Sequence, residues 1–152
     1  MAMKYEYFVW TDSLLIGNET IDNDHKVFFD IANLIVDLAN SGEADARSFR
    51  DSVKLLKNYA RAHFDREELF MRRIGYAQWI DNHIERHKQF VAIINEQALS
   101  VCVDDRKAIY FLANTIKDWI NSHIKEEDQK LKKYIDEMGI DDGTIANYMK
   151  FD

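Results

Sequence analysis

Residues 45–73 read DARSFRDSVKLLKNYARAHFDREELFMRR and include neither proline nor glycine. Apolar side chains recur along this stretch at steps of three and four residues, the spacing that places side chains on one face of an α-helix. One histidine and one glutamate fall in the same stripe. We therefore predict a long amphipathic helix over 45–73, with a buried face made of Val53, Leu56, Ala60, His63, Glu67, Phe70 and Met71.

Three further stretches, on either side of this one, carry the same pattern. They cover residues 20–38, 78–100 and 105–134, and each includes at least one histidine in phase with its apolar residues. A shorter amphipathic segment predicts a small helix over 144–150. Glycine is confined to the intervals between these segments, where helix boundaries are expected, at positions 17, 42, 75, 139 and 143.

Four long amphipathic helices joined by short connections bury their apolar stripes most simply as an antiparallel up-and-down four-helix bundle. The chain has 152 residues, of which 47% are apolar, enough to build one core and too few to promise two. We therefore expect an all-α fold in a single domain over residues 1–152. An N-terminal arm would precede the bundle and a short C-terminal helix would follow it.

The composition restricts the classes of partner. A formal net charge of -7 repels phosphate backbones and anionic lipid surfaces, so neither nucleic acid nor a membrane is expected to bind. The first ten residues lack the apolar core of a signal peptide, and no stretch is long enough to cross a bilayer. We therefore expect a soluble, cytoplasmic protein. The single cysteine, Cys102, cannot form an internal disulfide, and its apolar neighbours predict a packed, inert thiol rather than a catalytic one.

All five histidines lie on the predicted apolar stripes. One such histidine alone would be interpreted as a core residue with a hydrogen bond. Five imidazoles in one small core are different, because each loses solvation on burial and a shared metal satisfies their lone pairs together. The candidate ligands are His25, His63, His83, His87 and His123.

Residue spacing adds one carboxylate to this set. His63 and Glu67 are four residues apart, as are His83 and His87, so each pair projects from one face of its helix. Glu68 lies about 100° further round the helix, away from the stripe. The alternative for Glu67 is a solvated charge or a surface ion pair, and its phase with His63 favours the ligand.

The fourth helix leaves two carboxylates open. His123 is followed by a run of charged residues that would also suit a solvated surface. Helical periodicity prefers Glu127, four residues after His123, over Asp128 at five residues. A five-residue pair can share a site where the helix widens locally. Spacing alone does not decide between them.

The number and type of these donors indicate two metal ions. Five nitrogens and two or more carboxylates exceed the needs of one tetrahedral zinc, or of one octahedral ion with an open position. Nitrogen and oxygen donors inside a helical bundle suit a pair of iron or manganese ions. The ferritin-like di-iron class would show glutamate three residues before a histidine, and no histidine here has one.

Four segments of the chain together resemble the hemerythrin family, in its bacterial single-domain branch. The resemblance extends from about Trp10 to Leu131. Its motifs are IDNDHK at 21–26, HFDREELFM at 63–71, HIERH at 83–87 followed by Phe90, and WINSHI at 119–124 followed by Asp128.

The resemblance implies a non-haem di-iron centre with unequal halves. Three histidines would hold one iron and two the other, while two carboxylates and a solvent-derived oxo or hydroxo group would bridge them. It favours Asp128 over Glu127, and it leaves the two-histidine iron with an open position for dioxygen. The first iron would take His83, His87 and His123, the second His25 and His63, and the bridging carboxylates would be Glu67 and Asp128.

Residues one helical turn from these ligands are expected to line the oxygen pocket. Phe28, Trp119 and Ile120 would keep the pocket dry, although plain core packing explains them equally well. Glu126 stands where several relatives have an apolar pocket residue; it would admit water if it faced the open iron, and otherwise it is a solvated helix residue. Relatives often have proline after the tyrosine that opens the third helix, whereas this chain has Tyr76 followed by Ala77.

The function that the resemblance implies is reversible dioxygen binding, for transport, storage or sensing, without an enzymatic role. A di-iron enzyme or scavenger acting on peroxide or nitric oxide is the alternative from another class. A bundle whose contacts respond to metal or oxygen is a third possibility, and a metal-free bundle is the fourth.

Overall fold

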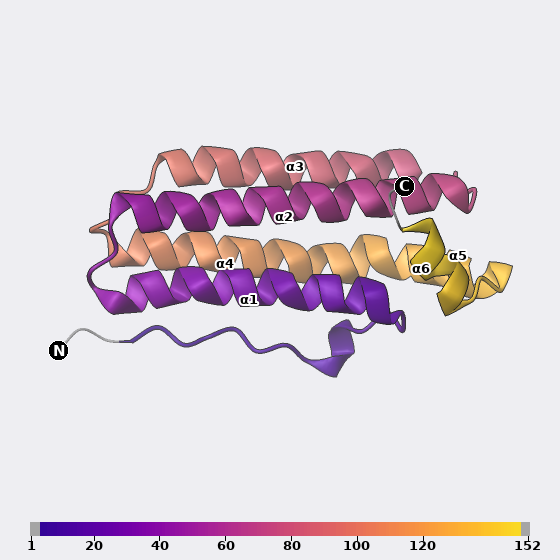
Figure 1. Cartoon of the computed structure of the whole chain (residues 1–152), viewed down its shortest axis with the longest axis horizontal. Helices are drawn as coiled ribbons and strands as arrows, with labels where there is room; N and C mark the ends of the chain where they lie inside the picture. Colours follow the sequence, from indigo (N-terminus) through magenta and orange to yellow (C-terminus); the bar gives the residue numbers. More distant parts are fainter. Residues whose placement is uncertain (1–3, 150–152) are drawn as a thin grey trace.

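The computed structural model describes residues 4–149, and all regular secondary structure in that range is helical. Figure 1 shows four long helices lying side by side, with successive helices running in opposite directions. The antiparallel bundle predicted from the apolar stripes is therefore confirmed. The four helices are α1 (Glu19–Ser41), α2 (Ala46–Arg73), α3 (Ile80–Leu99) and α4 (Arg106–His123).

The helices close into a ring around one core. Helix α1 packs against α2 and α4, and α3 packs against the same two neighbours. Each helix therefore turns its apolar stripe toward the shared interior, where Phe28, Leu56, Ile94 and Ile116 are fully buried. This arrangement brings the four histidine-bearing stripes into one interior.

Side-chain caps explain where three of the helices begin. Asn18, Asp45 and Asp105 each stand just before a helix and accept a hydrogen bond from a backbone N–H three residues later. After α1, Gly42 adopts a left-handed conformation with φ of 68°, which ends the helix without the strain that a side chain would bring there. The predicted starts at 20, 45, 78 and 105 agree with the structure to within two residues.

The fourth predicted helix is not one regular α-helix. Helix α4 ends at His123, a π-helical turn, η2 (Ile124–Asp128), follows it, and α5 (Gln129–Met138) continues to four residues beyond the predicted end. The backbone N–H of Gln129 donates to the carbonyl of Ile124, the five-residue spacing of a π-helix. The helix therefore widens directly after His123.

The segments outside the bundle pack onto its sides. The N-terminal arm carries a short 3₁₀ helix, η1 (Asp12–Leu14), and runs along the bundle, where Asn33 of α1 exchanges hydrogen bonds of 2.8 and 2.9 Å with the backbone of Phe8. The last helix, α6 (Asp142–Tyr148), packs against α2. It was predicted over 144–150, and position 150 lies outside the described residues.

One prediction about the core is wrong. Cys102 is exposed, because it lies in the connection between α3 and α4 rather than on a helix stripe. Its apolar neighbours Val101 and Val103 are partly buried against the core, and the chain turns so that the cysteine between them faces solvent. Within residues 4–149, none of the helices combines the length and the hydropathy needed to cross a membrane.

Candidate metal centre

The antiparallel arrangement gathers all five histidines at one end of the bundle. They come from the first half of α1, the second half of α2, the first half of α3 and the last residue of α4, which share the right-hand end of Figure 1. All five are buried, and so are both candidate carboxylates, with Glu67 and Asp128 having no exposed surface. The predicted ligands His25, His63, Glu67, His83, His87, His123 and Asp128 are thus brought together.

The cluster divides into two groups that share one residue. Ligand atoms of Glu67, His83, His87 and His123 all lie within 4.8 Å of one another, and the same holds for His25, His63 and Glu67. Three histidines therefore surround one possible ion position and two surround the other. Glu67 belongs to both groups.

Glu67 turns one carboxylate oxygen toward each group. Its Oε1 lies 2.6 Å from His83 Nε2 and 3.4 Å from His87 Nε2, while its Oε2 lies 3.3 Å from His63 Nε2. A carboxylate in this position can bridge two metal ions.

Asp128 repeats this arrangement from the other side of the cluster. Its Oδ1 lies 3.2 Å from His83 Nε2 and 3.4 Å from His123 Nε2, and its Oδ2 lies 3.1 Å from His25 Nε2. The cluster thus has two carboxylates, each with one oxygen directed to the three-histidine group and one to the two-histidine group.

The π-helical turn explains why Asp128, and not Glu127, enters the cluster. In a π-helix, residues five apart lie on the same face, so Asp128 follows His123 into the interior. Glu127 is also buried, but its Oε1 accepts a hydrogen bond of 3.0 Å from Asn82 Nδ2 on α3. The local widening that the sequence left open is therefore present, and it places Asp128 rather than Glu127 in the cluster.

Many ligand atoms of the cluster lack a hydrogen-bond partner. Both oxygens of Glu67, both oxygens of Asp128 and both ring nitrogens of His25 and His83 are buried without one among residues 4–149. Their close approaches are not aligned as hydrogen bonds, and buried polar groups are rarely left in this state. Converging donor atoms without hydrogen-bond partners fit a pair of metal ions, although His87 Nε2 and His123 Nε2 lie within hydrogen-bond distance of each other at 3.2 Å. Nitrogen with carboxylate oxygen is a donor set that suits iron.

The charges of the cluster favour cation binding. Burial alone raises the pKa of Glu67, but its contacts with His63, His83 and His87 outweigh burial and hold the pKa well below the ordinary value. Burial and Glu67 likewise raise the pKa of Asp128, and the neighbouring histidines, with His123 first, lower it overall. Both carboxylates are therefore anionic at neutral pH, the state in which they bind metals.

One histidine in each group is oriented by an outer carboxylate. His63 Nδ1 lies 2.7 Å from Asp24 Oδ2, and Asp24 in turn accepts hydrogen bonds from Tyr59 (2.9 Å) and Arg66 (3.2 Å). In the other group, the second ring nitrogen of a histidine also meets a carboxylate, with His87 Nδ1 lying 3.0 Å from Glu68 Oε2. Such contacts fix the ring orientation of metal-binding histidines and strengthen them as ligands.

Aromatic rings enclose the imidazoles. Trp119 stacks on His123 with ring centroids 4.5 Å apart, and Phe28 meets His63 edge to face at 5.6 Å. Phe64, which the sequence did not single out as a pocket residue, stacks on His87 at 4.0 Å. The nearest surroundings of the cluster are therefore largely apolar.

The remaining pocket candidates have different surroundings. Ile120 is buried, whereas Glu126 is exposed and lines a cavity of about 60 Å³ together with Arg86 and His123. Glu126 therefore stands beside the three-histidine group, at the surface. This place agrees with its interpretation as a solvated helix residue.

Comparisons with known proteins agree with this site. The family model described as "Hemerythrin HHE cation binding domain" matches residues 16–135. Bacteriohemerythrin from Clostridium acetobutylicum is 33% identical over 132 residues, which cover 85% of this chain and 99% of the relative. Bacteriohemerythrins from Campylobacter jejuni and Pseudomonas paraeruginosa are 27% and 30% identical, over 80% of this chain and over 90% and 77% of the relatives.

The match covers the four bundle helices and all seven residues that converge at the histidine cluster. The family model extends over most of the chain, and one relative is 33% identical over almost its whole length. Both matches include the helices that carry the buried cluster. The chain belongs to the hemerythrin family.

Proposed function

We propose that this chain is a cytoplasmic protein that binds dioxygen reversibly at a pair of iron ions. The observation that carries the proposal is the placement of Glu67 and Asp128, each of which directs one oxygen to each histidine group. Two carboxylates in this position would hold two ions between them, and the proposed pair would share an oxo or hydroxo group from solvent.

The two ion positions have unequal numbers of protein ligands. His83, His87 and His123 would hold one iron, and His25 and His63 the other, with both carboxylates shared. The two-histidine position therefore has one protein donor fewer and would keep the open place for dioxygen. A pair of ferrous ions supplies two electrons, one from each ion, for the reversible reduction of dioxygen.

The chain's own residues control water and charge around that chemistry. Phe28 and Phe64 lie against imidazoles of the cluster and keep water from its sides. Asp24 accepts a hydrogen bond from the N–H at His63 Nδ1, which leaves Nε2 directed inward. Only two carboxylates stand among seven ligands, so little negative charge stabilises highly oxidised iron. This balance favours reversible binding over an enzymatic oxidation.

The direct test combines metal analysis with a visible spectrum. The purified protein should contain two irons per chain, and the reduced form should develop an absorption band in air that disappears when oxygen is removed. Repeated cycles should restore the band with little loss. A zinc-loaded sample serves as the control, because zinc has no electrons to give and should show no oxygen-dependent band.

One feature favours a second candidate function. The cavity beside His123 is also lined by exposed Glu126 and Arg86, and it would bring water or a small anion to the three-histidine side of the cluster. Water at the centre would favour irreversible oxidation and a scavenging activity toward peroxide or nitric oxide. Rapid loss of the oxygen-dependent band, together with turnover of peroxide, would support this candidate and contradict the first.

A further inference from the structure

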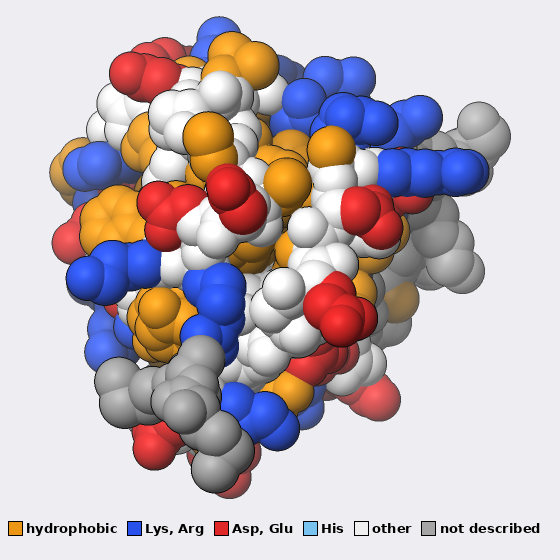
Figure 2. All heavy atoms as spheres, turned by 90° about the vertical axis from the view of Figure 1, so that its left-hand side faces the viewer, with side chains coloured by type: hydrophobic (Ala, Val, Ile, Leu, Met, Phe, Trp, Pro, Cys, Tyr) orange, Lys and Arg blue, Asp and Glu red, His pale blue; other side chains and the backbone are white. Residues whose placement is uncertain are grey.

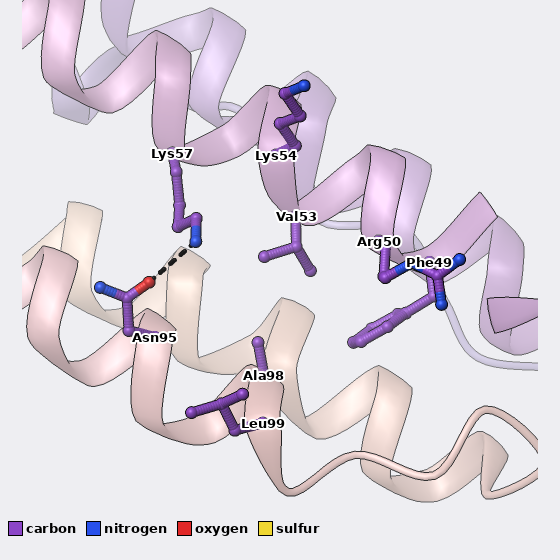
Figure 3. A pocket seen from close by; sticks show the side chains of 8 residues that line it. All are labelled: Phe49, Arg50, Val53, Lys54, Lys57, Asn95, Ala98 and Leu99. Atoms are coloured by element: carbon purple, nitrogen blue, oxygen red, sulfur yellow. Dashed lines mark hydrogen bonds between the residues drawn. The ribbon is translucent and has the colours of Figure 1, made fainter. Parts of the chain in front are cut away.

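A groove opens between α2 and α3 at the end of the bundle opposite the histidines. Its volume is about 550 Å³, within the range of about 300–1,000 Å³ that is usual for sites of small molecules. Figure 3 shows Phe49 and Val53 pointing down from α2 toward Ala98 and Leu99 of α3. None of the residues that line the groove belongs to the histidine cluster.

The groove exists because the core-facing side chains of α3 become smaller toward the C-terminal end of the helix. Phe90 and Ile94 fill the space facing the core and are buried, but the next residue in the same phase is Ala98, whose methyl group leaves room. Across the gap, Phe49 and Val53 are buried and form an apolar floor. Leu99 stands at the rim with 90% of its surface exposed.

The charge of the groove is opposite to that of the whole chain. The chain has 27 acidic and 20 basic residues, yet Arg50, Lys54 and Lys57 line the groove and no acidic residue of the described range 4–149 does. Figure 2, which views this end of the bundle, shows a group of Lys and Arg side chains at the upper right with hydrophobic side chains exposed beside it, and further basic and acidic side chains over the rest of the face.

The three cations have different surroundings. Lys57 donates to Asn95 Oδ1 at 3.0 Å, and this bond crosses the groove and closes one end of it (Figure 3). Arg50 and Lys54 make no ion pair or hydrogen bond with the part of the chain that the structure describes. They are four residues apart on α2, where two like charges repel each other. An anion at this edge would relieve that repulsion.

We propose that the groove binds an amphipathic small anion, namely a fatty acid of medium chain length. The acyl chain lies over Phe49, Val53 and Leu99, and the carboxylate lies at the edge that carries Arg50 and Lys54. An uncharged apolar ligand would leave the cations unused, and a hydrophilic anion would leave the apolar floor uncovered.

The length of the groove favours a small molecule over a helix of a partner protein. From Phe49 to Lys57, the α2 side covers eight residue-to-residue steps, or about 12 Å at 1.5 Å per step. Stable protein interfaces bury on the order of 1,000 Å² or more, which needs a much longer groove. The Lys57–Asn95 bond also blocks its continuation in one direction.

The test is a calorimetric titration of the full-length protein with laurate, below the concentration at which laurate forms micelles. We expect one site per chain, and binding at least about tenfold weaker for dodecanol and for the dodecyltrimethylammonium cation, which share the chain but lack the carboxylate. Metal-free and metal-loaded protein should bind laurate equally, because the groove shares no residue with the histidine cluster. This result is thus independent of whether the chain binds dioxygen.

Variants test the two halves of the proposal separately. Arg50→Gln combined with Lys54→Gln should weaken laurate binding about tenfold, and Leu99→Ser should weaken laurate and dodecanol together. The matched control is Arg61→Gln with Lys88→Gln, which removes two exposed cations outside the groove and should leave laurate binding unchanged. Helix content by circular dichroism should be the same in all variants.

Three results would overturn the proposal. The first is absence of laurate binding by the unmodified chain. The second is equal laurate binding by the groove variant, Arg50→Gln with Lys54→Gln, and by the control variant, Arg61→Gln with Lys88→Gln. The third is a dimer in sedimentation experiments that excludes laurate and that dissociates when Arg50→Gln is combined with Lys54→Gln, because the groove would then be a contact between two copies of the chain.

Discussion

The two ends of the bundle use the same four helices in different ways. At one end the buried positions hold hydrocarbon side chains such as Ile35, Leu56 and Leu112, which need only to fill space. At the other end, the equivalent stripes hold imidazoles and carboxylates, and several of their polar atoms have no hydrogen-bond partner. The hydrocarbon end thus needs packing alone, whereas the histidine end would depend on the proposed cations for its stability.

The two ends should respond differently to the loss of a side chain. Loss of one side chain at the hydrocarbon end leaves a gap that costs packing energy, and Ala98 shows that the bundle tolerates such a gap. Loss of one ligand at the histidine end leaves the remaining polar atoms buried and unpaired. The following predictions separate the two ends experimentally.

Removal of metal should have the largest effect. A ligand present at about 1,000 times its dissociation constant adds about 4 kcal/mol to the free energy of unfolding, so chelation should lower the melting temperature by about 10 °C. Hydrogen exchange should rise at η2 and at the start of α1, while amides near Ile35 and Leu112 stay protected. Equal loss of protection along the whole bundle would contradict the division into two ends.

A pair of truncations compares one residue from each end. Leu112→Ala should lower the free energy of unfolding by about 2–5 kcal/mol and leave two irons per chain, because it only opens a cavity. Glu67→Ala should lower the iron content, since this carboxylate reaches both histidine groups. Elemental analysis and thermal unfolding of both variants check the pair. Full iron content in Glu67→Ala would refute its place as a bridging ligand.

The helices were the part of the fold that the sequence predicted best, because the apolar spacing and the caps act over a few residues. Val53 to Met71 follow one face without interruption, and Asn18, Asp45 and Asp105 stand where the helices begin. The π-helical turn was not predicted. It replaces the regular spacing on which periodicity depends, so spacing left Glu127 and Asp128 open and only the resemblance to a family favoured Asp128.

The residues that support the ligands were not predicted either. Asp24 contacts His63 across 39 positions of sequence, and no local spacing indicates such a contact. Glu68 was correctly placed outside the ligand stripe, but its side chain reaches the outer nitrogen of His87 from there. The ligand positions lie in phase with the stripes, whereas their supports lie beside the stripes and depend on how the helices pack.

The pH dependence of the metal-free protein should report the histidine end. Contacts with Asp24 and Glu67 outweigh burial and raise the pKa of His63 to about 9. The protonated imidazole therefore adds to the free energy of unfolding below pH 6.5, and this contribution is lost as pH rises toward 9. Burial lowers the pKa of His123 to about 3, so stability falls as pH drops below 6.5, where only the unfolded chain takes up that proton.

The melting temperature of the metal-free protein should therefore be highest near pH 6.5 and should fall at lower and at higher pH. Metal-loaded protein should gain stability as pH rises above 6.5, because protons compete with metal for the imidazoles. The variant Leu112→Ala should keep the same pH profile at lower stability. A flat profile for the metal-free chain would show that the imidazoles do not change their proton affinity on folding.

The smallest expected effect distinguishes the two halves of the histidine end from each other. Asp24→Asn removes the charge that faces His63 Nδ1, and Glu68→Gln does the same at His87 Nδ1. Loss of such a contact weakens metal binding by about 10- to 100-fold without removing a ligand.

Under limiting iron, Asp24→Asn should therefore retain one ion at the three-histidine position and bind the second ion weakly. Glu68→Gln should instead weaken binding at the three-histidine position. The exposed Asp30→Asn on α1 is the matched control and should bind as the unmodified chain does. If both variants lost the two ions together, the centre would act as one cooperative unit, and Asp24 would have no separate influence on the position where dioxygen is proposed to bind.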